Sequence, residues 1–134
     1  MYQVLKITRS VATNSVDLLN LNTETKDLNC FDDSGLKGLE NFDFMEEENI
    51  YDCKLLLFGE FEKNSTGLGI EVTIIDKDVM VGNRKCFRVL IDSDVYYILE
   101  SDAKDIEVKE KMHYTFSRKD IVQVENVVHP VFLR

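Results

Sequence analysis

The feature that most constrains the fold of this chain is an alternation of apolar and polar residues with a period of two. Between Ile50 and Phe61, for example, Tyr51 and Leu55 fall on one side of an extended chain and Asp52 and Lys54 on the other. Successive side chains point to opposite faces only in a β-strand. No stretch longer than a dozen residues keeps helical spacing with caps at both ends. The chain is therefore predicted to be mainly β.

The same alternation predicts strands along the whole chain, with polar turns between them. The pair Gly82-Asn83 and the run at residues 92–94 read as tight turns of hairpins. Residues 36–44 are the best helical candidate, so at most one or two short helices are expected. Expected strands cover residues 2–8, 15–21, 28–31, 50–61, 70–75, 78–81, 85–91, 95–100, 112–116 and 121–124.

The expected strands and turns follow the same order in the first and second halves of the chain, which suggests an internal duplication. Val4 aligns with Val72 at an offset of 68 residues, residues 28–34 align with 96–102, and residues 48–55 align with 110–117. Because identities are few and any all-β chain alternates, both internal duplication and chance explain the alignment. The expected halves are 1–66, which is acidic, and 67–134, which is mixed in charge; residues 63–69 are the best internal boundary.

A unit of about 60 residues is marginal alone, so two such units must share a core. Short antiparallel strands remove their exposed edges by curling into small barrels. We therefore expect two small, partly open barrels in tandem, similar to the SH3 or OB type and packed as one compact unit. A single larger sheet folded on itself is the alternative.

The net charge of the chain limits the classes of partner that it can bind. The net charge is -9, and residues 1–60 carry five Lys or Arg against twelve Asp or Glu. This balance argues against nonspecific binding of nucleic acid or anionic membranes, which need clustered cations. No signal peptide or membrane-spanning run is found, and three cysteines without paired spacing predict reduced thiols. A cytoplasmic protein is expected, and its oligomeric state is left open.

The residues that could carry chemistry do not form recognisable sites. The spacing of Cys30, Cys53, Cys86, His113 and His129 lacks the close pairs of a zinc site, so no metal or cofactor is predicted. Spacing leaves open a Cys86–His113 catalytic pair, because such partners meet only in the fold. No catalytic residues are assigned, and the chain is expected not to be an enzyme.

One loop mixes acids with aromatic residues. Aromatic side chains supply contact area at an interface, and carboxylates steer a basic partner. The alternative is that Phe42 and Phe44 close the bottom of a barrel while the acids face water. The predicted partner-binding residues are Asp32, Asp33, Phe42, Phe44, Glu46, Glu47 and Glu48.

Basic residues in the second half of the chain form an alternative candidate binding surface. Small barrels bind single strands by stacking bases on aromatic residues in a basic groove. Acids such as Asp92 and Asp120 dilute this patch, so nucleic acid is the weaker hypothesis. The residues concerned are Arg84, Lys85, Arg88, Arg118 and Lys119.

The first hypothesis for function is a non-catalytic binding protein whose acidic surface engages a basic protein partner. It is similar in charge and size to bacterial immunity proteins and other small acidic inhibitors, although no motif is matched. The alternatives are the nucleic-acid-binding barrel, a structural or assembly module that pairs through sheet edges, and a small enzyme that uses carboxylates.

Overall fold

The computed structural model describes residues 1–62, 69–102 and 106–134. Within these ranges ten strands join in one sheet, which confirms the prediction of a mainly β chain. The helical segments are short: α1 (Ser34–Lys37), η1 (Glu100–Asp102) and η2 (Pro130–Leu133). The strands are β1 (Tyr2–Arg9), β2 (Asn14–Asn20), β3 (Lys26–Asp32), β4 (Ile50–Tyr51), β5 (Cys53–Phe61), β6 (Ile70–Val81), β7 (Arg84–Ile91), β8 (Asp94–Leu99), β9 (Lys111–Val124) and β10 (Val127–Val128).

Two strands that were expected to be interrupted are continuous, and the helix expected at residues 36–44 does not form. The strands predicted at 70–75 and 78–81 are one strand, β6, and those at 112–116 and 121–124 are one strand, β9. The polar run at 117–120 stays extended because β5 and β3 pair with it from opposite sides.

Residues 36–44 do not form a helix because polar side chains take their backbone amides. The Phe42 amide donates to Ser34 Oγ at 3.0 Å, and the Asp43 amide donates to Asn41 Oδ1 at 3.0 Å. Only α1, at Ser34–Lys37, is helical there.

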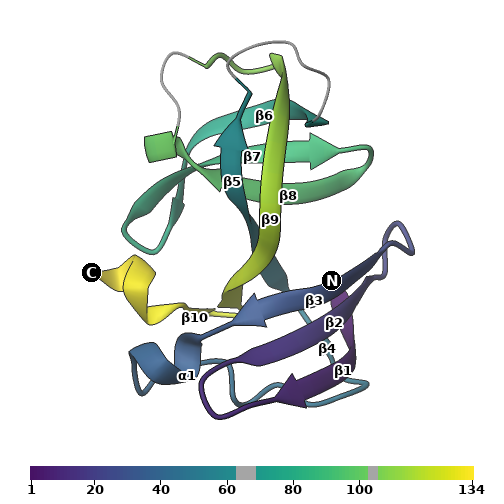
Figure 1. Cartoon of the computed structure of the whole chain (residues 1–134), viewed down its shortest axis with the longest axis vertical. Coiled ribbons are helices and arrows are strands. Elements are labelled where there is room, and N and C mark those ends of the chain that lie inside the picture. Colours follow the sequence, from purple (N-terminus) through teal and green to yellow (C-terminus); the bar gives the residue numbers. More distant parts are fainter. Residues whose placement is uncertain (63–68, 103–105) are drawn as a thin grey trace.

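The sheet consists of two three-stranded meanders joined by two long strands. Strands β1, β2 and β3 follow one another in antiparallel order, and so do β6, β7 and β8. Strands β5 and β9 form an antiparallel pair from Cys53↔Val124 to Phe61↔Tyr114. Figure 1 shows the second meander above, the first meander below, and β5 and β9 running between them.

The pairings around the second meander return to their starting strand, whereas the path around the first meander returns through a chain connection. In the upper ring β9 pairs with β5, β5 with β8, β8 with β7, β7 with β6, and β6 again with β9. In the lower ring β4 pairs with β1, and the path continues through β2, β3 and β9 to β5. Since only Asp52 separates β4 from β5, this ring also closes on itself. Strands β5 and β9 therefore belong to both rings.

The two rings meet along one line of four residues. Phe31 of β3 pairs with Asp120 of β9 in parallel, Asp120 pairs with Leu56 of β5, and Leu56 pairs with Tyr97 of β8 in parallel. The third strand of each meander thus lies beside the long strand from the other half of the chain. The sheet has an approximate two-fold arrangement about the β5–β9 pair.

One main hydrophobic cluster collects side chains from both halves. Val4 and Leu18 of the first meander and Val72 and Ile74 of the second are fully buried in it, together with Tyr114 of β9. A smaller cluster combines Leu56 of the first half with five buried residues of the second. Both clusters of the described residues therefore draw on both halves, which fits the marginal size of a 60-residue unit. The predicted boundary at 66/67 lies outside the described residues.

We predict that Gly59→Ala destabilises the protein by about 2–4 kcal/mol. A Cβ atom at Gly59 would lie 1.9 Å from the carbonyl oxygen of Thr115 and 2.6 Å from Cα of Phe116, where the β5–β9 register shifts. Backbone atoms cannot move aside without opening the ladder that both rings share. Urea unfolding measures the effect.

The control is Gly35→Ala, because a Cβ there meets only the Asp43 carboxylate at 3.7 Å, an ordinary contact. If Gly59→Ala and Gly35→Ala had equal midpoints, the close approach of β5 and β9 at Gly59 would be refuted.

Candidate functional site

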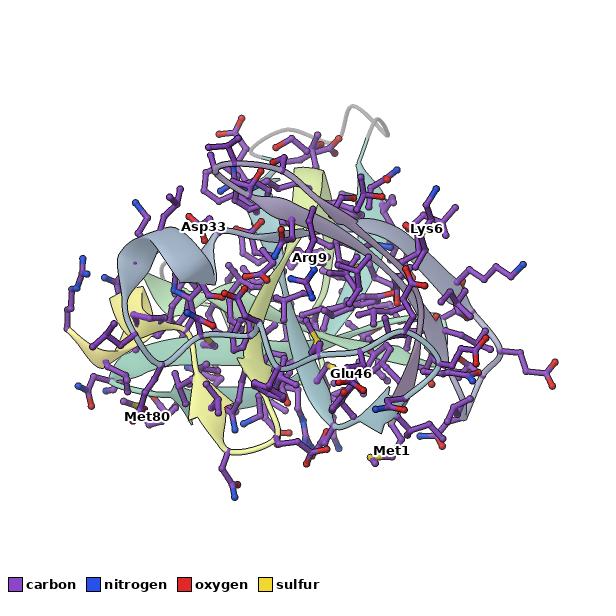
Figure 2. All side chains as sticks on the ribbon, turned by 90° about the horizontal axis from the view of Figure 1, so that it is seen from below. Met1, Lys6, Arg9, Asp33, Glu46 and Met80 are labelled. Atoms are coloured by element: carbon purple, nitrogen blue, oxygen red, sulfur yellow. The ribbon has the colours of Figure 1, made fainter. Side chains whose placement is uncertain are left out.

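The segment between α1 and β5 carries a concentration of exposed acidic residues. Residues 38–52, here named the acidic loop, contain six Asp or Glu and no Lys or Arg. All six carboxylates are exposed. Figure 2, which views the molecule from below, shows the segment crossing this face with Glu46 on it. The acids are Glu40, Asp43, Glu46, Glu47, Glu48 and Asp52.

Two buried side chains anchor the acidic loop to the core. Phe42 is 1% exposed and Met45 is 2% exposed, and both belong to the main cluster. The Met45 amide donates to the Phe42 carbonyl, and the Glu46 amide donates to the hydroxyl of Tyr51 at 2.9 Å. The turn between these anchors therefore has a defined conformation, which directs the carboxylates outward.

The loop also covers the free edge of β1. The Glu48 amide donates to the Val4 carbonyl at 2.7 Å, and the Val4 amide donates to the Asn49 carbonyl at 2.9 Å. Further along, Glu47 Oε1 accepts a hydrogen bond from the Ile7 amide at 3.0 Å. A side-chain carboxylate at this position satisfies an edge amide that would otherwise be available to another strand.

Two apolar side chains stand among the acids. Phe44 is 43% exposed and Ile50 is 50% exposed. Phe44 packs edge-on against Tyr51, with ring centroids 5.9 Å apart, so its position is fixed although it faces water. An ordered aromatic side chain inside a charged rim is a usual element of a protein interface.

The structure brings together four of the seven residues that the sequence predicts for partner binding. Phe44, Glu46, Glu47 and Glu48 are exposed on the acidic loop. Phe42 lies in the core, as the alternative interpretation of that residue expects.

Asp32 and Asp33 lie at the end of β3 and are engaged in the fold. Asp32 is 3% exposed and accepts hydrogen bonds from Ser34. Asp33 Oδ1 lies 2.6 Å from Nε2 of His129, which is itself 6% exposed. The Val131 amide donates to Nδ1 of this ring, so a neutral imidazole carries its hydrogen on Nε2 and donates it to Asp33. This contact joins β3 to η2.

Most of the predicted basic residues are paired with carboxylates. Arg88 lies 2.5 Å from Asp76, Lys85 lies 3.7 Å from Asp78, and the guanidinium of Arg84 stacks on the ring of Phe132. These three residues lie on β7, whereas Arg118 and Lys119 lie on β9.

The side chain of Arg118 lies between two aromatic side chains, at the place where the upper and lower rings of strands meet. Its guanidinium carbon is 4.4 Å from the centroid of Phe31 and 4.3 Å from that of Phe58. Two of its nitrogens also donate to the carboxylate of Asp120, at 2.7 and 3.2 Å. Burial nevertheless raises the pKa of Asp120, because the effect of desolvation exceeds that of Arg118.

The fully buried carboxylate of Asp27 joins the two meanders, a feature that the sequence did not reveal. Its Oδ1 accepts from the Tyr96 hydroxyl at 2.7 Å and lies 2.5 Å from Nζ of Lys119. Its Oδ2 has no hydrogen-bond partner among the described residues. Burial and the bond to Asp27 raise the pKa of Tyr96. The partners lie 69 and 92 residues away from Asp27, so no local pattern announces them.

The three cysteines are buried, and none of them forms a disulfide. Burial raises the pKa of Cys30 and of Cys53 to about 12, which keeps both thiols protonated at neutral pH. Of the pair left open by spacing, Cys86 is fully buried in the smaller hydrophobic cluster, whereas His113 is exposed on β9.

Among the residues that the structure describes, no group of three or more His, Cys, Asp or Glu is arranged to hold a metal ion. No helix in the same ranges is long and apolar enough to span a membrane. Comparisons of the chain with protein-family models, with curated proteins and with solved structures give no match.

We predict that Lys119→Met destabilises the protein by about 3–5 kcal/mol, because it leaves the buried Asp27 carboxylate without its cation. The control is Lys85→Met, whose ion pair with Asp78 is 64% and 67% exposed, so its effect stays within about 0.5 kcal/mol. Urea unfolding at neutral pH measures both. Equal, small effects would show that Asp27 and Lys119 are not coupled.

The raised pKa of Asp120 predicts the sign of a pH effect. A carboxyl whose pKa is higher in the folded protein favours folding at low pH, and that contribution is lost as the pH rises through the folded value. The free energy of unfolding of the wild type, relative to Asp120→Asn, is therefore expected to be larger near pH ~4 than near pH ~7.

Urea unfolding of both proteins across this range measures the difference. The exposed Asp92→Asn, compared with the wild type in the same way, controls for loss of a surface carboxylate. A difference for Asp120→Asn that grows in the opposite direction would contradict the dominance of desolvation.

Proposed function

We propose that this chain is a non-catalytic binding protein whose acidic loop engages a basic surface of a protein partner. The observation that supports this most is the composition and exposure of residues 38–52: six exposed carboxylates, no Lys or Arg, and the exposed Phe44 and Ile50 among them. An inhibitor or an immunity-like protein that neutralises a basic target is one form of this function.

The physical roles of the two kinds of side chain differ. Carboxylates of one sign raise the association rate with a basic partner and disfavour acidic ones. Phe44 and Ile50 supply apolar area, which stabilises the complex once it has formed. The loop is held by Phe42, Met45 and the edge of β1, so binding costs little ordering entropy.

We also propose that the two rings of strands are two small, partly open barrels that arose by internal duplication. Each half supplies a three-stranded meander and then a long strand, and each long strand pairs in parallel with the third strand of the other half. A unit that exchanges its long strand with its copy retains one shared core, which fits the single main cluster. Three buried cysteines that form no disulfide are compatible with a reducing compartment such as the cytoplasm.

A nucleic-acid interface on the second half has weaker support. Four of the five basic residues assigned to it pair with carboxylates: Lys85, Arg88, Arg118 and Lys119. Phosphate binding requires cations whose charge is not already matched.

Reversal of three charges on the acidic loop tests the main proposal. Glu40, Glu46 and Glu48 are replaced by Lys, while Glu47 is kept because its carboxylate accepts the Ile7 amide. Because these side chains project from a pinned backbone, the fold is expected to survive, and capture of basic proteins from the native cell is expected to be lost. Affinity capture followed by mass spectrometry measures this.

The matched control reverses three exposed acids elsewhere, Glu71, Asp92 and Glu107. It changes the net charge by the same amount and is expected to retain the captured partner. Equal capture by wild type and the Glu40, Glu46, Glu48 variant would overturn the proposal, and so would capture that does not weaken as ionic strength rises.

A further inference from the structure

A polar pocket of about 280 Å³ opens between the β1–β2 turn and α1, at one end of the acidic loop. This volume is just below the range of about 300–1,000 Å³ typical of small-molecule sites, and it suits one inserted side chain. The residues that matter for its chemistry are Arg9, Val11, Asp32, Gly35, Leu36 and Asp43.

The inner wall carries a carboxylate oxygen without a protein partner. Asp32 is 3% exposed, and both of its hydrogen bonds, from the amide of Ser34 at 2.9 Å and from its hydroxyl at 2.6 Å, go to Oδ1. Among the described residues no hydrogen bond reaches Oδ2, and this atom keeps some solvent exposure at the pocket that Asp32 lines. A buried anion with one unused oxygen favours a cation in the adjoining space.

The rim of the pocket suits a long aliphatic stem that ends in a positive charge. Val11 is fully exposed at the β1–β2 turn, and Leu36 is 57% exposed on α1. Asp43 adds a second carboxylate to the lining. Arg9 contacts Asp43 at 3.9 Å, with both side chains more than half exposed, and its Nη2 donates a long hydrogen bond of 3.5 Å to the Met45 carbonyl. Because both contacts are long and the ion pair is exposed, an incoming cation can replace Arg9 beside Asp43 at little cost.

We propose that this pocket receives a lysine side chain of the protein partner. The inference rests on the proposed function, since Asp43 belongs both to the acidic loop and to the pocket. It adds a specific anchor to a surface that would otherwise act mainly through its overall charge.

The hydrogen bonds of Asp32 favour lysine over arginine. A guanidinium binds best in a bidentate manner to two free carboxylate oxygens. Oδ1 of Asp32 already accepts two hydrogen bonds, so only Oδ2 remains. An ammonium group is a compact charge with three donors, and it can use a single oxygen while the stem packs on Val11 and Leu36.

The substitution Asp32→Asn isolates the free oxygen. An asparagine Oδ1 can still accept both hydrogen bonds from Ser34, so the turn is retained while Oδ2 is replaced by a neutral donor. The exposed Asp92→Asn is the control for the loss of one negative charge.

The probe is N-acetyl-lysine methylamide, titrated into the ¹⁵N-labelled protein and followed by amide chemical shifts. Saturable shifts confined to residues 9–14, 32–36 and 43 are expected, with the dissociation constant at least about tenfold higher for Asp32→Asn and unchanged for Asp92→Asn. The arginine analogue should bind more weakly, and the Nε-acetylated lysine analogue should give no localised shifts.

Three results would overturn the pocket: no localised shifts with the lysine probe, equal affinity in Asp32→Asn, or tighter binding of the arginine analogue. These results are separable from failure of the proposed function, because loop-dependent partner capture tests that function by itself. If the Glu40, Glu46, Glu48 variant loses its partner but Asp32→Asn binds the probe normally, the partner-binding role of the acidic loop is supported and the lysine pocket is refuted.

Discussion

The antiparallel pairing of β5 with β9 is the interaction on which the rest of this fold depends. Each of these strands completes both the ring built on β1–β3 and the ring built on β6–β8. Their contact is long-range, since Cys53 pairs with Val124 and Phe61 with Tyr114. The chain segment between β5 and β9 must bring these two strands together before either ring of strands can form. The two halves are therefore expected to fold together.

A polar contact fixes how the two meanders meet. Asp27 comes from the first meander, Tyr96 from the second, and Lys119 from the long strand between them. Burying this carboxylate is costly, and an apolar trio of similar volume would stabilise the fold at least as well. Its physical advantage is directional: hydrogen bonds and an ion pair are satisfied in only one register of β3, β8 and β9. Apolar packing alone is less selective among registers.

The sequence predicts the strands well and the contacts between them poorly. Alternation located β1 and β2 because one face of each is buried. It also located β5 and β7, although Leu56 and Cys86 are buried on the second face of these strands. A break in β9 was wrongly predicted at 117–120, because the charged residues there resemble a turn. Pairing with β3 and β5 on both sides keeps these residues extended. For the site, the acids and Phe44 could be predicted from composition. The burial of Phe42 was one of two interpretations of that residue. The burial of Asp32 could not be predicted, because it depends on Ser34, whose hydroxyl donates to Asp32 and accepts from the Phe42 amide.

The acidic loop combines electrostatic repulsion with a rigid backbone. Six carboxylates within residues 38–52 repel one another, and the segment itself contains no Lys or Arg. Arg9 of β1 offsets the charge of Asp43 only through an exposed contact of 3.9 Å. A loop free to move would separate these charges. Here Phe42 and Met45 hold it to the core, and the edge of β1 holds it near Glu47 and Glu48. The anchors thus keep a concentrated negative charge in place. Under the proposed function, a basic surface that docks there would relieve the repulsion at little ordering cost, and both effects would favour association.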